Sequence, residues 1–107
     1  MRVIARGTLK AFVQQQPNAQ DRPALEKALN SWYSEVRSAT WRSTADVKQR
    51  YRTASIVSAE RIVFNICGNK YRLIVAVDFH KGVVWIKWIG THADYDRIDA
   101  KDVQHRV

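Results

Sequence analysis

The chain has 107 residues, of which 46% are hydrophobic and 26% are charged, so one globular domain over residues 1–107 is expected and a disordered chain is excluded. The formal net charge of +8 favours a polyanionic partner such as nucleic acid, although many small basic proteins bind none. Cys67 is the only cysteine and no apolar run approaches the roughly 20 residues of a membrane span, so we expect a cytoplasmic protein without membrane contact.

The first part of the chain predicts a strand and a helix. Residues 1–4 are β-like, and Thr8 is a candidate N-cap for the helix that follows. Its apolar residues recur at helical spacing, namely Leu9, Phe12 and Val13. The polar run at residues 14–18 is expected to end this helix.

A second, clearer amphipathic helix is predicted to begin near Asp21 and Pro23. Its apolar face comprises Leu25, Leu29, Trp32 and Val36. A weak capping box at residues 43–46 predicts a short third helix, which leads into a strand near Ile56 and Val57.

From Arg61 the hydrophobic period changes to that of β-structure, and three consecutive strands are expected. Gly68-Asn69 and residues 80–82 are the turn signals between them. The middle strand has one wholly apolar face, which comprises Tyr71, Leu73, Val75, Val77 and Phe79. Because that face should meet the helices, the chain is predicted to be an α+β protein, a small antiparallel meander with N-terminal helices packed on one face.

Two cations interrupt the apolar runs of this sheet. Arg72 is expected on the face away from the helices, and alternation places Lys87 there too, opposite Val84, Ile86 and Trp88. With Trp85 as a stacking surface, the two cations would form an open groove for a phosphate backbone. The alternative is a solvated sheet face whose cations pair with Asp78 or keep the protein soluble.

Residues suited to proton transfer follow the last strand directly. A helical turn would place His92 and Tyr95 on one side, and Asp96 could orient either side chain. Cleavage of RNA by its own 2′-hydroxyl needs proton transfer and stabilisation of phosphorane charge, which His or Tyr and Arg or Lys can supply. Alternatively, His92 and Tyr95 cap the strand and pack against it. No metal-ligand spacing or glycine-rich phosphate loop is present, so no metal or cofactor is expected.

A second basic cluster precedes the sheet and includes aromatic neighbours. It comprises Arg42, Lys48, Arg50 and Arg52. Contact with a phosphate backbone and a solvated helix face explain it equally well.

The run at residues 63–69, continuing to Arg72 and Leu73, resembles the hairpin of HigB toxins, members of the RelE-like superfamily. Lys87 and the sequence T-H-A-D-Y-D at residues 91–96 resemble the same family. The resemblance spans nearly the whole chain and is strongest from residue 61 to 98. It implies the same α+β fold and a toxin that cleaves mRNA on the ribosome and arrests growth. It also implies a HigA-like helix-turn-helix antitoxin as partner. The toxin would then contact operator DNA only through this antitoxin.

The resemblance also implies roles for individual residues. The arginine of the central strand matches Arg72, and the histidine and tyrosine after the last strand match His92 and Tyr95. The expected catalytic residues are therefore Arg72, Lys87, His92, Tyr95 and Asp96. The expected RNA-binding residues are Arg61, Asn65, Lys70 and Trp85. Some superfamily members have a lysine pair on the strand before Arg72, where this chain has Arg61 and Asn65. The alternative function is a non-catalytic RNA- or ribosome-binding module.

Overall fold

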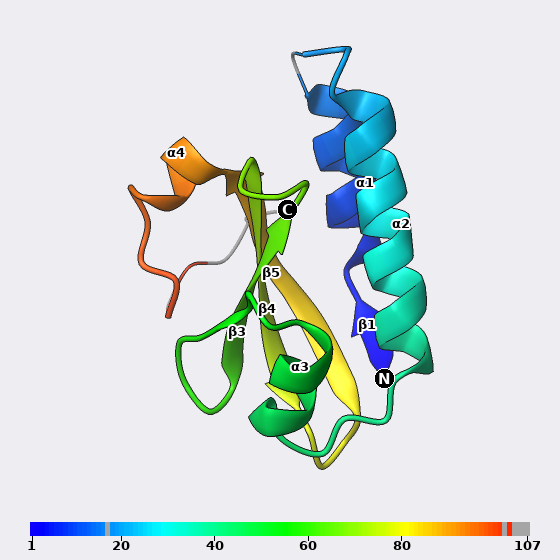
Figure 1. The fold of residues 1–107 in the computed structure, drawn as a ribbon, viewed down its shortest axis with the longest axis vertical. Coiled ribbons are helices and arrows are strands. Elements are labelled where there is room, and N and C mark those ends of the chain that lie inside the picture. Colours follow the sequence, from blue (N-terminus) through cyan, green and yellow to red (C-terminus); the bar gives the residue numbers. More distant parts are fainter. Residues whose placement is uncertain (17, 102, 104–107) are drawn as a thin grey trace.

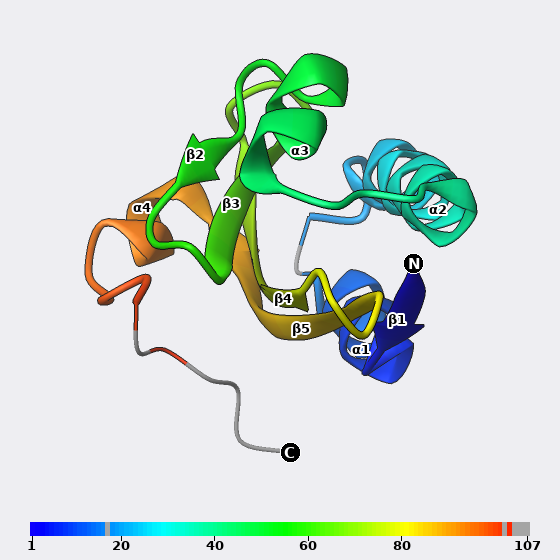
Figure 2. The ribbon, with the colours of Figure 1, turned by 90° about the horizontal axis from the view of Figure 1, so that it is seen from below.

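A five-stranded sheet, with strand order β1-β5-β4-β3-β2, organises the computed structural model, which describes residues 1–16, 18–101 and 103 (Figures 1 and 2). The elements are β1 (Arg2–Ile4), α1 (Arg6–Gln15), α2 (Arg22–Ser38), α3 (Thr44–Arg50), β2 (Ser55–Ile56), β3 (Arg61–Ile66), β4 (Tyr71–Asp78), β5 (Val83–Thr91) and α4 (His92–Tyr95). The predicted α+β class is confirmed. The meander is antiparallel from β2 to β5, and β1 adds a parallel edge strand beside β5.

The helices form largely where the hydrophobic pattern places them. The four residues of the predicted apolar face of α2 are all buried. Thr8 is not the cap of α1, because its backbone N–H already bonds to Ala5 O at 3.0 Å inside the first turn. The N-cap half of the capping box before α3 is confirmed, since the Ser43 hydroxyl accepts the Asp46 N–H at 3.4 Å. The Asp46 carboxylate in turn accepts the Arg42 N–H at 2.8 Å.

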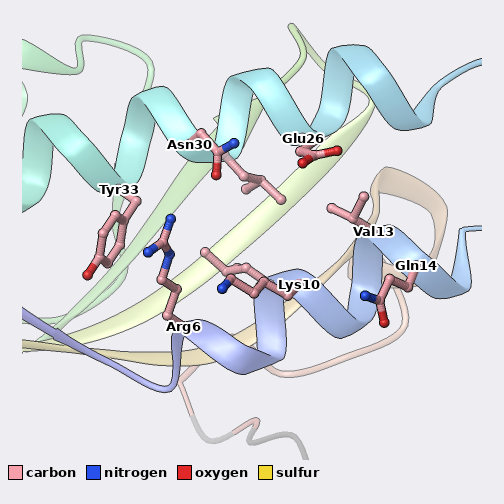
Figure 3. A pocket seen from close by; sticks show the side chains of 9 residues that line it. Arg6, Lys10, Val13, Gln14, Glu26, Asn30 and Tyr33 are labelled. Carbon is pink, nitrogen blue, oxygen red and sulfur yellow. The ribbon is translucent and has the colours of Figure 1, made fainter.

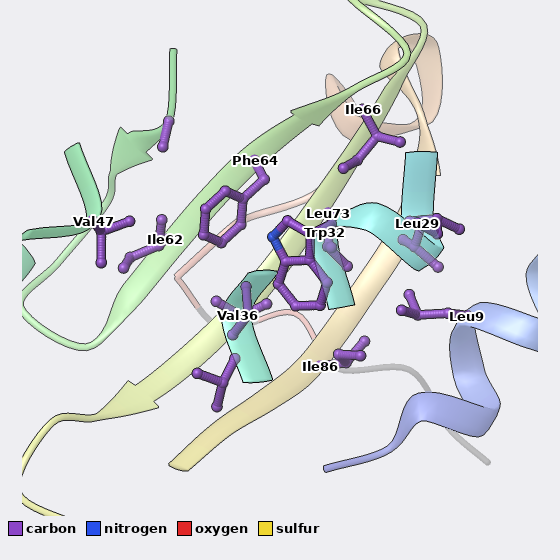
Figure 4. Close-up of a cluster of buried hydrophobic side chains, with 14 of the residues drawn as sticks. Leu9, Leu29, Trp32, Val36, Val47, Ile62, Phe64, Ile66, Leu73 and Ile86 are labelled. Atoms are coloured by element: carbon purple, nitrogen blue, oxygen red, sulfur yellow. The ribbon is translucent and has the colours of Figure 1, made fainter. Parts of the chain in front are cut away.

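The main core lies between the helices and one face of the sheet (Figure 4). The Trp32 and Phe64 rings meet edge to face, with centroids 5.4 Å apart. The predicted apolar face of β4 is buried here from Tyr71 to Val77, and Phe79 packs at its margin. This burial of aromatic and aliphatic side chains fixes the helices against the sheet.

A β-bulge in β5 overturns part of the predicted alternation. Val75 pairs with Ile86, whereas the preceding Ile74 pairs with Trp88, so Lys87 is the extra residue. Trp88 consequently points away from the main core, and Ile89 takes its place there. The prediction that Trp88 shares a face with Val84 and Ile86 is therefore wrong.

The sheet face away from α1 and α2 is not an open, solvated surface. At its centre a second apolar cluster is formed by Val63, Ile74 and Trp88. Tyr95 covers this cluster together with the C-terminal segment, which we define as residues 97–101 and 103. The alternative of a wholly wet face is therefore wrong, because the C-terminal segment divides that face into two ends.

Candidate active site

Three rows of side chains cross the sheet face away from the helices. The strand register defines them as the Arg72 row (Asn65, Arg72, Gly90), the Trp88 row (Val63, Ile74, Trp88) and the Trp85 row (Arg61, Ala76, Trp85). The Trp88 row is buried under Tyr95 and the C-terminal segment. Consequently the Arg72 row and the Trp85 row lie on opposite sides of a covered strip.

Arg72 is held in place at the end of β4. Its Nη1 donates to Asn69 O at 3.0 Å and to Tyr71 O at 3.2 Å. Its Cζ lies 5.9 Å from the centroid of the Tyr95 ring, within the range of a cation–π contact. Because both carbonyl contacts use one nitrogen, the other guanidinium N–H groups are oriented but remain available to a phosphate oxygen.

Trp88 and Gly90 position the Tyr95 ring that contacts Arg72. The sequence pattern indicated neither residue as part of the site. The Trp88 and Tyr95 rings pack with centroids 6.4 Å apart. The Trp88 indole also covers the Cα position of Gly90, the neighbour of Arg72 across the sheet. The signal available in the sequence was the glycine inside a strand, which marks a close approach of another group.

His92 begins the predicted helical turn, which is confirmed as α4. Its backbone N–H donates to Lys70 O at 3.0 Å, and the Thr91 hydroxyl caps the turn by accepting the Asp94 N–H at 3.2 Å. The His92 Nε2 lies 3.9 Å from Asp96 Oδ2, and the two side chains are 53% and 64% exposed. That distance is too long for a hydrogen bond, so the two side chains are near each other without being bonded.

The two lysines of the predicted site have different surroundings. Lys87 occupies the bulge, is half-buried, and makes no side-chain hydrogen bond or ion pair with the residues that the structure describes. Lys70 instead lies at the helix side, where its Nζ is 3.4 Å from Asp21 Oδ1. Tyr71 OH approaches the same carboxylate, and burial first, then Asp21, raises the pKa of that phenol.

The remaining RNA-binding predictions fall on both sides of the covered strip. Asn65 lies beside Arg72 and therefore belongs to the candidate site. Arg61 lies in the Trp85 row, and its Nη1 donates to Ala100 O at 3.3 Å and Val103 O at 2.8 Å. Arg61 thus holds the C-terminal segment, and the structure does not bring Arg61 or Trp85 together with Arg72.

The second basic cluster is largely used inside the protein. Lys48 Nζ donates to Arg52 O at 2.8 Å and Ala54 O at 2.7 Å, and so closes the loop after α3. Arg50 forms an ion pair with Glu35 at 2.6 Å. These contacts favour the solvated-face explanation over a phosphate contact for Lys48 and Arg50.

A small pocket between α1 and α2 lies apart from all of these residues (Figure 3). Leu9 and Leu29 line its floor, and Arg6, Lys10 and Glu26 stand at its rim. Its volume is about 140 Å³, below the roughly 300–1,000 Å³ of ordinary small-molecule sites. The described residues contain no group of three His, Cys, Asp or Glu side chains that could hold a metal ion.

The family model of HigB_toxin, the RelE-like toxic component of a toxin-antitoxin system, matches residues 25–98. The chain belongs to this family. The matched region runs from α2 to the residues just after α4, so it contains every residue of the candidate site. No curated protein matches the chain. As a HigB-family toxin, the protein has an antitoxin as its partner. Among the described residues, no helix has the length and apolarity needed to cross a membrane.

Proposed function

We propose that this HigB-family toxin is a ribosome-dependent mRNA endonuclease and that residues 1–107 form one RelE-like toxin domain. The observation that carries the proposal is the contact between the Arg72 guanidinium and the Tyr95 ring, 5.9 Å apart at the end of the sheet. It places a fixed cation beside a phenol, and α4 adds His92 within the same helical turn. Inhibition of translation and growth follows from cleavage of mRNA.

The proposed reaction is attack of a ribose 2′-hydroxyl on the adjacent phosphorus. The new O–P bond forms as the bond to the 5′-oxygen breaks, which leaves a 2′,3′-cyclic phosphate and a 5′-hydroxyl. Arg72 donates hydrogen bonds to the phosphate, and the Lys87 ammonium, which has no bonded partner among the described residues, adds a second charge. Both stabilise the negative charge that develops on the non-bridging oxygens.

Proton transfer is assigned to His92 and Tyr95. One takes the proton of the 2′-hydroxyl and the other protonates the leaving 5′-oxygen, so that protons balance over the step. Asp96 Oδ2, 3.9 Å from the His92 Nε2, would orient the ring. Asn65 lies beside Arg72 and would position the RNA strand. Lys70, which is paired with Asp21 on the helix side, would contact only RNA that passes the end of the sheet. Arg61 and Trp85 could reach only RNA that crosses the C-terminal segment.

The antitoxin is proposed to be HigA-like, with a helix-turn-helix that binds operator DNA, so that the toxin meets DNA only through its antitoxin. Action on translating ribosomes places the toxin in the cytoplasm. The net charge of +8 supports contact with RNA and with an acidic partner.

The test is cleavage of mRNA on purified ribosomes by the full chain and by Tyr95→Phe. Tyr95→Phe keeps the ring that Arg72 and Trp88 contact and removes only the hydroxyl. We expect cleavage to fall about 10²–10⁴-fold, the usual worth of a general acid or base, at unchanged melting temperature. His92→Gln and Arg72→Lys should lose comparable activity. Message with a 2′-deoxyribose at the cleaved position should remain intact, and products with a 3′-hydroxyl would refute the mechanism.

The second candidate is a non-catalytic RNA- or ribosome-binding module. The observation that favours it is that the His92 imidazole lies toward Asp96 in solvent, with Lys70 O on its backbone. In that case Tyr95→Phe and His92→Gln would arrest growth like the parent chain, and toxin-bound ribosomes would carry uncut message.

A further inference from the structure

A basic hollow lies at the end of the sheet opposite α4. In Figure 1 the β4–β5 turn, the start of β1 and the end of α2 gather there, far from α4. The hollow has a volume of about 810 Å³, and no Asp or Glu is among the residues that line it. Its basic lining residues are Arg2, Arg37, Arg42, His80 and Lys81.

The four permanent cations of this hollow are not used to hold the fold. Arg2, Arg37, Arg42 and Lys81 are exposed, and their side chains make no hydrogen bond, ion pair or ring contact with the described residues. By contrast, several cations elsewhere hold a carbonyl or carboxylate, as Lys48 does. Four unpaired cations at one hollow raise the local potential, which attracts anions.

The nearby sources of negative charge are fewer than these four cations. One is the Asp46 carboxylate, which accepts the Arg42 N–H at 2.8 Å. The Met1 ammonium, at the lining of the hollow, donates to carbonyls at the end of α2 and at its C-cap, namely Val36 O at 3.2 Å, Arg37 O at 3.1 Å and Ala39 O at 2.6 Å. A cation at that position cancels the negative end of the helix dipole. At the margin, the Asp78 carboxylate accepts the Lys81 N–H at 2.9 Å.

The aromatic lining offers little for reading bases. Trp41 is buried in the main core, and the Tyr33 ring is covered by the Arg6 guanidinium at 3.9 Å. Phe79 is half-buried at the margin of the main core and is the remaining aromatic ring of the lining. A hollow with four cations and one partly open ring suits the sugar-phosphate backbone, whose contacts carry no sequence information. We propose that the hollow is a second RNA-backbone site, separate from the Arg72 site.

The spacing of the two sites fits one RNA strand. Arg72 and Asp78 lie six residues apart on β4, which corresponds to about 20 Å along the strand. Because the C-terminal segment covers the Trp88 row between them, one RNA strand that contacts both sites would pass beside this covered strip. This inference rests on the proposed action on RNA but not on cleavage.

The test measures binding of the full chain to single-stranded RNA with 2′-O-methyl riboses, which lacks the attacking hydroxyl. The variant is Arg37→Gln/Lys81→Gln, and the control is Lys10→Gln/Lys27→Gln, which loses the same charge at exposed positions outside the hollow. Each lost phosphate contact should lower the slope of log affinity against log salt by about 0.7, or affinity by about fivefold at 0.1 M salt. The hollow variant should therefore lose about 25-fold.

Several outcomes overturn the proposal. Equal losses in the hollow variant and the control would mean a general charge effect. An unchanged salt slope would show that no phosphate is bound there. If the hollow variant kept RNA affinity and lost affinity for the antitoxin, the hollow would bind an acidic protein. Because the RNA cannot be cut, these results stay distinct from failure of the cleavage mechanism, which Tyr95→Phe tests separately.

Discussion

The Trp88 ring occupies the space above the Cα of Gly90. A Cβ atom at position 90 would lie closer than 3.0 Å to two carbons of that ring, a separation that real Cβ atoms essentially never show. Since the same ring packs on Tyr95, and Tyr95 contacts Arg72, the missing side chain of Gly90 is linked to the geometry of the candidate site.

Gly90→Ala should therefore displace Trp88 and Tyr95. Overpacking of this kind costs about 1–3 kcal/mol in the free energy of unfolding, and cleavage should fall more steeply than stability because the Tyr95 hydroxyl moves. Chemical denaturation and the ribosome cleavage assay measure the two effects. Gly7→Ala is the control, since a Cβ at Gly7 meets nothing within 4 Å. In a double-mutant cycle, Trp88→Leu should reduce the loss of stability that Gly90→Ala produces. If it does not, the clash with Trp88 is not the cause of that loss.

Arg61→Met should release the C-terminal segment. The change removes two charge-assisted hydrogen bonds, to Ala100 O and Val103 O, and keeps a similar apolar stem. We expect a loss of about 1–3 kcal/mol in the free energy of unfolding and faster amide exchange after Ile98. Arg52→Met, at an exposed position outside the segment, should change neither. Unchanged exchange combined with weaker RNA binding would instead support the RNA-binding role predicted for Arg61.

Lys48→Met separates the two explanations of the second basic cluster. Lys48 Nζ bonds two carbonyls of the loop that follows α3, so its loss should lower the free energy of unfolding by about 1–3 kcal/mol. RNA affinity should fall no further than in Lys27→Met, which removes the same charge on α2. Thermal unfolding and RNA binding of both variants provide the measurement. A purely electrostatic residue would give the opposite pattern, with stability retained and affinity lost.

The parts of the fold that the sequence predicts are those with a local physical cause. The apolar stripe of α2 repeats at steps of four and three, and that spacing alone determines which face is buried. The bulge at Lys87 has no comparable sequence signal. The alternation of side chains is intact on either side of it, so the local sequence does not show which residue is extra. The site prediction therefore included neither Trp88 nor Gly90.

The hydrophobic pattern also did not predict that the C-terminal segment covers the second sheet face, although the sequence contains part of the evidence for it. Val63 and Ile74 are apolar on the face that alternation leaves exposed, and such residues need something to bury them. The covering residues, Ile98 and Ala100 among them, have no period of their own. The long-range bonds of Arg61 to Ala100 O and Val103 O, together with packing on Trp88, hold these residues over the sheet.

Tyr51 should make the protein sensitive to alkaline pH. Burial, followed by the hydrogen bond to Glu35 and its charge, raises the pKa of Tyr51 above the ordinary value of 10.0. The folded state therefore holds this proton more tightly than the unfolded state does. Its contribution to stability is complete below pH 10 and is lost as the pH rises from there toward the folded-state pKa.

Tyr51→Phe should flatten that alkaline decline. For the parent chain, the free energy of unfolding should fall above pH 10, with Tyr51 contributing less than about 1.4 kcal/mol per pH unit, since the side chain is half-buried and partly screened. At pH 7, Tyr51→Phe should cost about 1–3 kcal/mol, because the Glu35 carboxylate loses its phenol donor. Denaturant titrations from pH 7 to pH 11 compare the two slopes. Tyr33→Phe is the control, as its ring stacks with Arg6 without the Glu35 bond. If the free energy of unfolding falls with pH equally in the parent and in Tyr51→Phe, another group causes the loss of stability at alkaline pH.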